Sequence, residues 1–251
     1  MSRHIRSLQT LAIPSLLALA CASAPTQAAT VSLRVELQSA EHAARPATPS
    51  KNAPPVSVIA WLTPLGPAAA DTIAQRRSVE LQQSYRLVQK NKQFSPHILV
   101  VPTGASVDFP NLDPFFHNVF SLFNGRRFDL GLYEAGSHRA VRFDREGVSY
   151  LFCNIHPEMA AVIVSLATPF YASAAKDGSL SLADVPPGDY ELHLWAENVS
   201  LADLSSAGRR LHVTAADLAL PPVRLLVTTQ PGQLHKNKFG EDYPQHPETP
   251  Y

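Results

Sequence analysis

Residues 153–159 read CNIHPEM and place Cys153, His156 and Met159 at intervals of three. The stretch lies between two runs with the β-branched and aromatic composition of strands, residues 148–153 and 159–166. One loop between two strands can therefore gather a thiolate, an imidazole and a thioether around one ion. This donor set suits copper, because thiolate and thioether favour Cu(I) whereas imidazole tolerates both Cu(I) and Cu(II).

A trigonal copper site of this kind needs a second imidazole in addition to the thiolate and a weak axial thioether. The stretch PFFHNVF at residues 114–120 supplies one, because it places His117 just after a turn at residues 111–114. From spacing alone, the alternative is a partly buried histidine among aromatic side chains. The spacing thus makes His117 a candidate ligand and does not by itself decide between a metal ligand and a partly buried histidine.

The N-terminus has the order of a secretory signal, which we place at residues 1–29. Arg3 and Arg6 precede an apolar stretch at residues 11–20, and small residues follow up to Ala29. A membrane-spanning helix needs about 20 apolar residues, which is longer than this stretch. We therefore expect an exported, periplasmic protein whose mature form has no transmembrane segment.

Cys21 leaves with that signal, so the mature chain keeps one cysteine, Cys153, and one methionine, Met159. A lipoprotein signal at Cys21 is the alternative, but Ala18 is a poor match where a large aliphatic residue is usual. A lone thiol in an exported chain is buried and inert, paired with another chain or bound to a metal. The mature chain has 19 basic and 21 acidic residues, which gives no indication of nucleic-acid binding.

The rest of the chain predicts an all-β fold. The 22 prolines of the full sequence and the frequent turn residues favour strands over long helices. An Ala-, Pro- and Ser-rich loop is expected at residues 39–55. The clearest predicted strands are residues 31–38, 56–62, 97–101, 106–109, 148–153, 159–166, 190–195, 210–214 and 223–228.

About 80 residues of the chain, 86–168, resemble the cupredoxins. The resemblance is carried by FSP at 94–96, VVPTG at 100–104, VDFPN at 107–111, HNV at 117–119 and the stretch at 153–159. The Cys-x-x-His-x-x-Met spacing is similar to that of amicyanins. The longer runs also resemble bacterial cupredoxin-like proteins named methylamine utilization proteins.

The resemblance implies a Greek-key β-sandwich with a mononuclear type 1 (plastocyanin-like) copper site. One copper ion would be held closely by His117, Cys153 and His156, and more weakly by Met159 as the axial ligand. Asn118 would steady the ligand loops through hydrogen bonds. The implied function is one-electron transfer with a periplasmic redox protein that the sequence does not identify.

Residues 170–197 resemble a different module, the carboxypeptidase-regulatory-like, transthyretin-type β-sandwich, and the early strands look like its beginning. We therefore expect the copper domain at 78–168 to interrupt a second sandwich made of 30–66 and 169–228, followed by a disordered tail at 229–251. The alternative is two consecutive domains, with the early strands joining the copper sandwich.

Other function classes fit the sequence less well. Copper oxidases use paired His-x-His motifs and binuclear electron-transfer sites use a second cysteine in the ligand loop, and the sequence contains neither. We therefore expect no enzyme activity. Two alternatives remain: a mononuclear copper enzyme with Glu134, Glu158 or His138 as an extra ligand, and a copper-binding or scaffold protein whose regulatory-like domain docks a partner.

Overall fold

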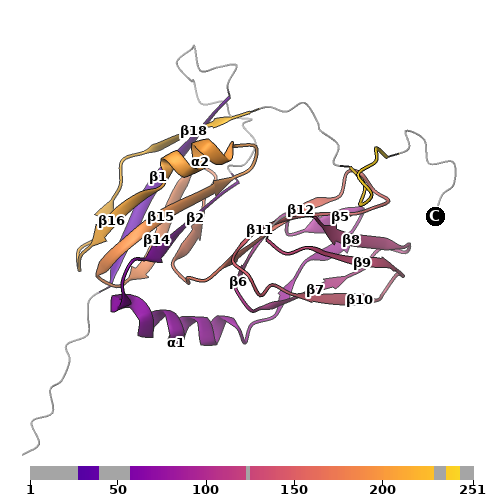
Figure 1. The fold of residues 1–251 in the computed structure, drawn as a ribbon, viewed down its shortest axis with the longest axis horizontal. Coiled ribbons are helices and arrows are strands. Elements are labelled where there is room, and N and C mark those ends of the chain that lie inside the picture. Colours follow the sequence, from indigo (N-terminus) through magenta and orange to yellow (C-terminus); the bar gives the residue numbers. More distant parts are fainter. Residues whose placement is uncertain (1–27, 40–56, 123–124, 229–235, 244–251) are drawn as a thin grey trace, which may run out of the picture.

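The computed structural model describes residues 28–39, 57–122, 125–228 and 236–243, and the expected all-β class is confirmed (Figure 1). Most of the predicted signal peptide and the predicted loop at 39–55 lie outside the described residues. The strands form two groups of sheets that lie side by side in Figure 1.

The first group joins strands from the two ends of the chain. One of its sheets has the order β14-β1-β17, with β18 also paired to β1, and the other has the order β13-β2-β15-β16. The strands are β1 (Ala29–Ser39), β2 (Val58–Pro64), β13 (Tyr171–Ser173), β14 (Ser179–Val185), β15 (Gly188–Ala196), β16 (Arg209–Val213), β17 (Leu218–Ala219) and β18 (Val223–Val227). Strands that precede the second group of sheets in the sequence thus pair with strands that follow it, and the division into domains stays a prediction.

The second group carries the candidate site. A five-stranded sheet has the order β6-β12-β11-β8-β9, a three-stranded sheet has the order β10-β7-β3, and β4 and β5 form a hairpin. The strands are β3 (Tyr85–Arg86), β4 (Val88–Lys90), β5 (Gln93–Ser95), β6 (Ile98–Pro102), β7 (Ser106–Pro110), β8 (His117–Ser121), β9 (Phe128–Tyr133), β10 (His138–Arg142), β11 (Gly147–Phe152) and β12 (Ala160–Leu166).

Strand β12 is apolar on both faces because it lies between two hydrophobic cores. Val162 and Val164 belong to the core of the first group of sheets, whereas Ala161 and Ile163 belong to the core that also contains Cys153. Side chains alternate between the faces of a strand, so β12 contributes to both cores at once. The two groups are therefore packed against each other through this sheet.

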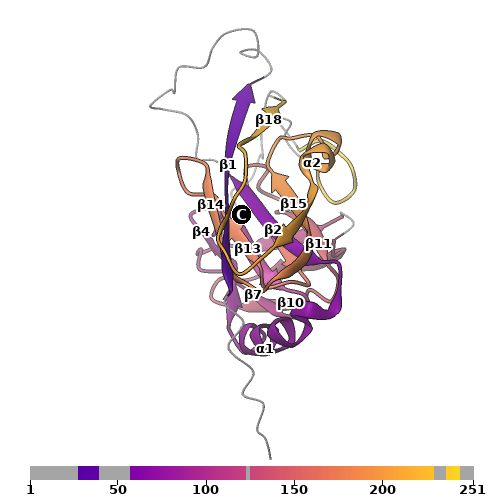
Figure 2. The same ribbon diagram turned by 90° about the vertical axis from the view of Figure 1, so that its left-hand side faces the viewer.

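Two short helices were not predicted from the sequence. Helix α1 (Ala70–Glu80) follows the 3-10 turn η2 (Pro67–Ala69). Helix α2 (Leu201–Ala207) is capped by Ser200, whose side chain accepts a hydrogen bond from the Asp203 backbone. No residue of α1 is buried, so it lacks the apolar stripe by which amphipathic helices are recognised. It lies along the lower side of both views (Figure 1, Figure 2).

A histidine also joins the two groups of sheets. The His97 ring contacts the Glu197 carboxylate at 2.7 Å through Nε2 and the Ala160 carbonyl at 3.1 Å through Nδ1. Both partners are acceptors, so the protonated imidazolium satisfies both. The hydrogen bond to Glu197 raises the pKa of His97 above its ordinary value, and desolvation only partly opposes this rise.

Replacing His97 with Gln should therefore lower stability in a pH-dependent way. Because the folded-state pKa is raised, the stabilisation is complete below the ordinary pKa of about 6.5 and is lost as the pH rises through the folded-state value. His97 is half-exposed, so we expect a Tm loss of at most about 3 °C at pH 6. Thermal melts at pH 6 and pH 9 measure this loss of Tm. The control is His212→Gln in β16, where the histidine pairs with Asp189 at an exposed site. Equal losses of Tm at both pH values in His97→Gln would contradict the stabilising role of protonated His97.

Candidate metal centre

Three predicted ligands come together in the structure. The ligand atoms of His117, Cys153 and His156 all lie within 4.8 Å of one another. The two Nδ1 atoms are 3.1 Å apart, and the Cys153 Sγ lies 3.8 Å from His117 Nδ1 and 3.6 Å from His156 Nδ1.

These separations fit a single metal ion. An ion about 2.0 Å from each nitrogen and about 2.3 Å from the sulfur, the usual metal–ligand lengths for imidazole and thiolate, produces a triangle of this size. Two imidazole nitrogens that both present lone pairs repel each other at 3.1 Å, and a cation between them removes that repulsion. The donor set therefore fits a metal, and its thiolate and imidazoles are ligands that copper accepts.

His117 is oriented by a buried carboxylate. It is the first residue of β8 and is fully buried, and its Nε2 lies 2.8 Å from Asp113 Oδ2. Because the carboxylate accepts the Nε2 proton, the tautomer leaves the Nδ1 lone pair facing Cys153 and His156. Carboxylate partners of this kind fix the ring orientation of metal-bound histidines.

Asp113 is itself held by the tip of the β4–β5 hairpin. Asn91 and Lys92 both have positive φ, 56° and 55°, and their backbone N–H groups donate to the Asp113 carboxylate at 2.6 and 2.9 Å. Burial raises the pKa of Asp113, but the hydrogen bonds from Lys92, His117 and Asn91 outweigh burial and leave the pKa below its usual value. The site thus contains a buried negative charge next to His117.

Cys153 follows β11 and is fully buried. Burial raises the pKa of its thiol, whereas backbone N–H groups of Asn118, Ile155 and His156 donate to the sulfur and oppose that rise. The loop is closed by a hydrogen bond from Cys153 N to Met159 O at 3.3 Å and another from Met159 N to His156 O at 3.1 Å. The backbone therefore shapes the loop around the sulfur before any ion binds.

His156 is the partly exposed member of the three. Burial and the neighbouring His117 lower the pKa of His156, which keeps its ring neutral and able to bind a metal. The Phe115 ring packs beside both imidazoles, with centroid distances of 5.2 Å to His117 and 5.6 Å to His156. An aromatic side chain thus covers the two imidazoles on one side.

The other two predicted residues lie close to this cluster. Met159 is fully buried in the same core as Cys153, and its role as axial ligand stays a prediction. The Asn118 side chain donates to Asp129 Oδ1 at 2.7 Å and to the Gly131 carbonyl at 3.0 Å, so it links β8 to β9 and not to the ligand loop. Asn118 contacts the sulfur through its backbone.

The extra ligands considered for an enzyme are not in the cluster. Among the described residues, the metal-binding group contains His117, Cys153 and His156 without Glu134, Glu158 or His138. Glu158 is exposed, and His138 is hydrogen-bonded to Asp108 at 2.6 Å on the outside of β10.

The sequence interpretation missed Asp113 and the C-terminal contacts. Asp113 lies four residues before His117 in the turn at residues 111–114, and that spacing was the available signal. Residues 236–243, which fall within the tail expected to be disordered, instead form a turn against the ligand loop. The polar and proline-containing composition of the whole stretch 229–251 hid this contact, because the contact is made through hydrogen bonds.

Part of this chain is similar to several solved structures. A copper-containing nitrite reductase from Thermus scotoductus SA-01 matches with 22% identity and a TM-score of 0.32, over 34% of this chain and 22% of that one. A purple cupredoxin from Nitrosopumilus maritimus matches with 23% identity and a TM-score of 0.30, over 33% of this chain and 100% of that one. A reduced mutant form of amicyanin matches with 17% identity and a TM-score of 0.32, over 42% of this chain and 98% of that one.

This chain spans only about a fifth of the nitrite reductase. No family model and no curated protein matches the sequence. Because the TM-scores are low and each likeness covers less than half of the chain, the function proposed below rests on the geometry of the site.

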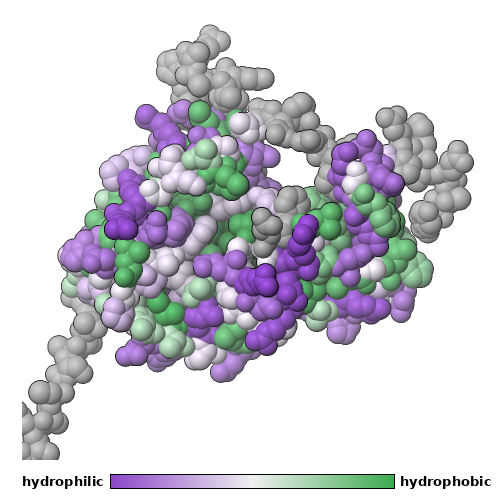
Figure 3. Space-filling model, in the orientation of Figure 1, coloured by the Kyte–Doolittle hydropathy of each residue, from purple (hydrophilic) through white to green (hydrophobic). Residues whose placement is uncertain are grey.

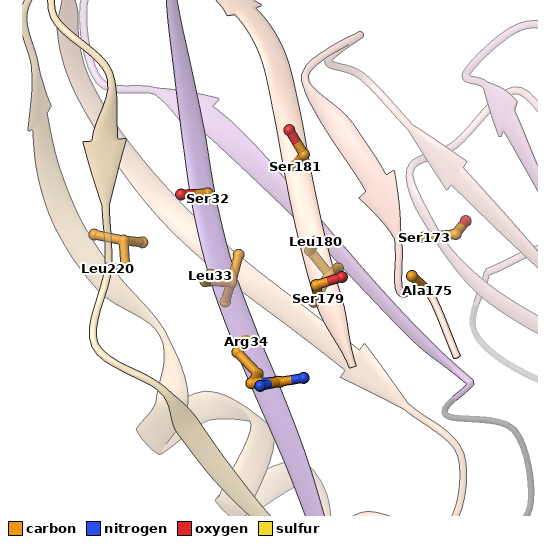
Figure 4. A pocket seen from close by; sticks show the side chains of 9 residues that line it. All are labelled: Ser32, Leu33, Arg34, Ser173, Ala175, Ser179, Leu180, Ser181 and Leu220. Atoms are coloured by element: carbon orange, nitrogen blue, oxygen red, sulfur yellow. The ribbon is translucent and has the colours of Figure 1, made fainter. Parts of the chain in front are cut away.

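A separate depression is lined mainly by residues of β1 and β14 (Figure 4). Small polar side chains, including Ser32, Ser179 and Ser181, line it beside Arg34, which is ion-paired with Asp177 at 3.0 Å. Its lining includes none of the predicted ligands. Among the described helices, none is long and apolar enough to cross a membrane.

Proposed function

We propose that this chain is a mononuclear type 1 copper protein that carries single electrons. The observation that supports it most directly is the triangle of His117 Nδ1, Cys153 Sγ and His156 Nδ1, with sides of 3.1, 3.6 and 3.8 Å. Bound copper would supply the Cu(I)/Cu(II) couple. A trigonal His₂Cys set with a weak axial methionine is the arrangement used for electron transfer.

Copper fits better than zinc because of the fourth candidate donor. Structural zinc sites take four tetrahedral ligands from cysteine, histidine and carboxylates, and the described cluster holds only three of these. Met159, the buried residue that closes the ligand loop, carries a thioether, which is a ligand that selects copper. The proposed site therefore has His117, Cys153, His156 and Met159 as its ligands and takes one copper ion.

Burial of the site supports electron transfer over catalysis. His117, Cys153 and Met159 are fully buried, which leaves little access for a substrate, whereas His156 is partly exposed and gives a short path for an electron. Leu112 and Phe116, on either side of Asp113, are also exposed. Apolar surface gathers at the end of the second group of sheets (Figure 3), where a periplasmic redox protein would dock.

Spectroscopy on the purified protein tests the proposal. With one equivalent of Cu(II), we expect an intense visible thiolate-to-copper band and an EPR signal with a narrow copper hyperfine splitting. One equivalent of ascorbate should bleach the band, and ferricyanide should restore it over repeated cycles. Tight zinc binding without copper colour, or copper that is reduced once and released, would contradict the electron-carrier assignment.

The buried Asp113 carboxylate should lower the reduction potential, because a negative charge favours Cu(II) over Cu(I). Asp113→Asn keeps an acceptor for His117 Nε2 but removes the charge. We expect the potential to rise by roughly 50–100 mV, the effect of one charge about 7 Å away at an effective dielectric constant of about 20. Voltammetry measures the change.

Asp144→Asn is the control, because Asp144 is paired with Arg126 at the surface. It should leave the potential unchanged. An unchanged potential in Asp113→Asn as well would mean that the carboxylate is too well screened to influence the metal.

A further inference from the structure

The described part of the C-terminal region, residues 236–243, folds into a compact turn. The Asn237 side chain organises it by accepting hydrogen bonds from the backbones of Phe239 and Glu241 at 2.9 and 3.0 Å. Backbone bonds between Asn237 and Glu241 and from Gly240 to Asn237 complete the turn. We refer to residues 236–243 as the C-terminal segment.

This segment makes two hydrogen bonds to the ligand loop. The Lys238 backbone N–H donates to Asn154 Oδ1 at 2.9 Å, and the Tyr243 hydroxyl donates to the Cys153 carbonyl at 2.6 Å. Cys153 and Asn154 are the first two residues of the loop that carries the thiolate and His156. The segment therefore contacts the backbone of the thiolate ligand itself.

The same segment reaches the strand pair that carries His117. Lys238 Nζ lies 2.7 Å from Asp129 Oδ2 in β9, and the other oxygen of Asp129 accepts the Asn118 side chain at 2.7 Å. Asn118 follows His117 and donates its backbone N–H to the Cys153 sulfur. A closed chain of contacts thus runs from the ligand loop through Lys238 and Asp129 to Asn118 and back to Cys153.

The environment of these contacts makes them effective restraints. Lys238 is mostly buried, with 26% of its side chain exposed, and the pKa of Asp129 is lowered by Lys238, Gly131 and Asn118 although burial alone would raise it. Partly buried charge-assisted hydrogen bonds are stronger than exposed neutral ones.

We propose that the C-terminal segment is a structural part of the metal centre, in which Lys238 and Tyr243 are positioning residues that hold the Cys153 loop closed against the His117 strand. This inference rests on the copper site proposed above. Its consequence is that the segment limits opening of the loop. It thereby protects the Cys153 thiol when no metal is bound and slows metal release when copper is bound.

The first test uses the metal-free protein, so it does not depend on copper binding. The rate of Cys153 alkylation by iodoacetamide under native conditions reports loop opening. Tyr243→Phe removes one hydrogen bond and should raise this rate about fivefold. A chain that ends at Thr228 loses the whole segment and should react more than about tenfold faster.

Two matched controls separate loop opening from general destabilisation. Tyr190→Phe removes a similar bond, from a tyrosine hydroxyl to the Pro186 carbonyl at 2.8 Å, in the other sandwich. A chain that ends at Tyr243 keeps the segment and lacks only residues 244–251. Both should alkylate at the wild-type rate.

The second test uses the copper-loaded protein and a Cu(I)-specific chelator such as bathocuproine disulfonate. Each sample starts with one copper per chain. The rate of copper loss should rise by the factors expected for alkylation, about fivefold in Tyr243→Phe and more than about tenfold in the chain ending at Thr228. Lys238→Met, which keeps the backbone bond to Asn154 but loses the ion pair with Asp129, should fall between the wild type and the truncated chain.

The outcomes separate the two proposals. Wild-type alkylation rates in Tyr243→Phe and in the chain ending at Thr228 would overturn the role of the segment, whatever the copper result. An equal rate increase in Tyr190→Phe would also overturn it, because the effect would then be global. Faster alkylation in a protein that never binds copper would support the segment as a restraint on the loop and reject the copper site.

Discussion

Cys153→Ser should abolish the intense visible band of the copper-loaded protein completely. That band arises from charge transfer between a cysteine thiolate and Cu(II), and Cys153 is the free cysteine of the described chain, with its sulfur 3.6 and 3.8 Å from the two imidazole nitrogens. A serine hydroxyl is a harder donor that stays protonated at neutral pH. We therefore expect weak, colourless copper binding with an EPR spectrum typical of nitrogen and oxygen ligands.

Absorption and EPR spectra with a metal analysis check this result. Serine is close to cysteine in size, so a circular dichroism spectrum and melt should show a folded protein. His193→Gln is the control, because His193 stacks on Trp61 in the other sandwich, with ring centroids 5.3 Å apart, and should leave the band intact. A coloured Cys153→Ser protein would refute the site.

The candidate ligands could be predicted because their chemistry is local in sequence. Cys153, His156 and Met159 share one short loop, and strands β11 and β12 on either side of it have clear β-sheet composition. The structure brings His117 to Cys153 and His156 as the resemblance implies. The sequence pattern and the three-dimensional contacts agree because two adjacent strands carry the ligands. Strand β11 leads into the ligand loop, and it pairs with β8, which begins at His117.

Strand β9 was missed because its central glycine weakens the strand signal, although Phe128, Leu130 and Leu132 alternate with Asp129 and Gly131. Gly131 interrupts it with a φ of 67°, and a register shift occurs opposite it, between Asn118 and Phe120 in β8. The role of Asp113 could not be read from composition either, since its importance depends on the positive-φ turn of a hairpin 21 residues earlier. The hairpin contact and the register shift depend on the tertiary arrangement, and the local signal was limited to the four-residue spacing of Asp113 and His117.

The apolar run in β12 shows a different limit of sequence patterns. The strand predicted at residues 159–166 corresponds to β12. Both of its faces are apolar because the sheet lies between two hydrophobic cores, and the sequence pattern did not indicate this arrangement. The same holds for Tyr150 in β11, whose hydroxyl accepts a hydrogen bond from Trp195 Nε1 at 3.2 Å across the junction. Pattern alone cannot tell which neighbour covers a buried face.

Met159→Gln should keep copper bound but lower its reduction potential by at least about 60 mV, which corresponds to a tenfold change in the relative affinity for the two copper states. The reason is that a thioether is a soft donor that stabilises Cu(I), whereas an amide oxygen is harder and favours Cu(II). The backbone bonds of Met159 to Cys153 and His156 do not involve its side chain, so the loop should keep its shape. Voltammetry of both proteins measures the shift.

Met159→Leu separates an axial ligand from a core side chain. Leucine keeps the apolar volume of this fully buried position but cannot coordinate, so Cu(II) loses a weak fourth donor and the potential should stay the same or rise. If Met159 were only part of the core, Gln would lower the melting temperature through burial of an unpaired amide, and the potentials of both variants would match the wild type. A potential that falls in the Gln variant and does not fall in the Leu variant is therefore the result that assigns Met159 to the metal.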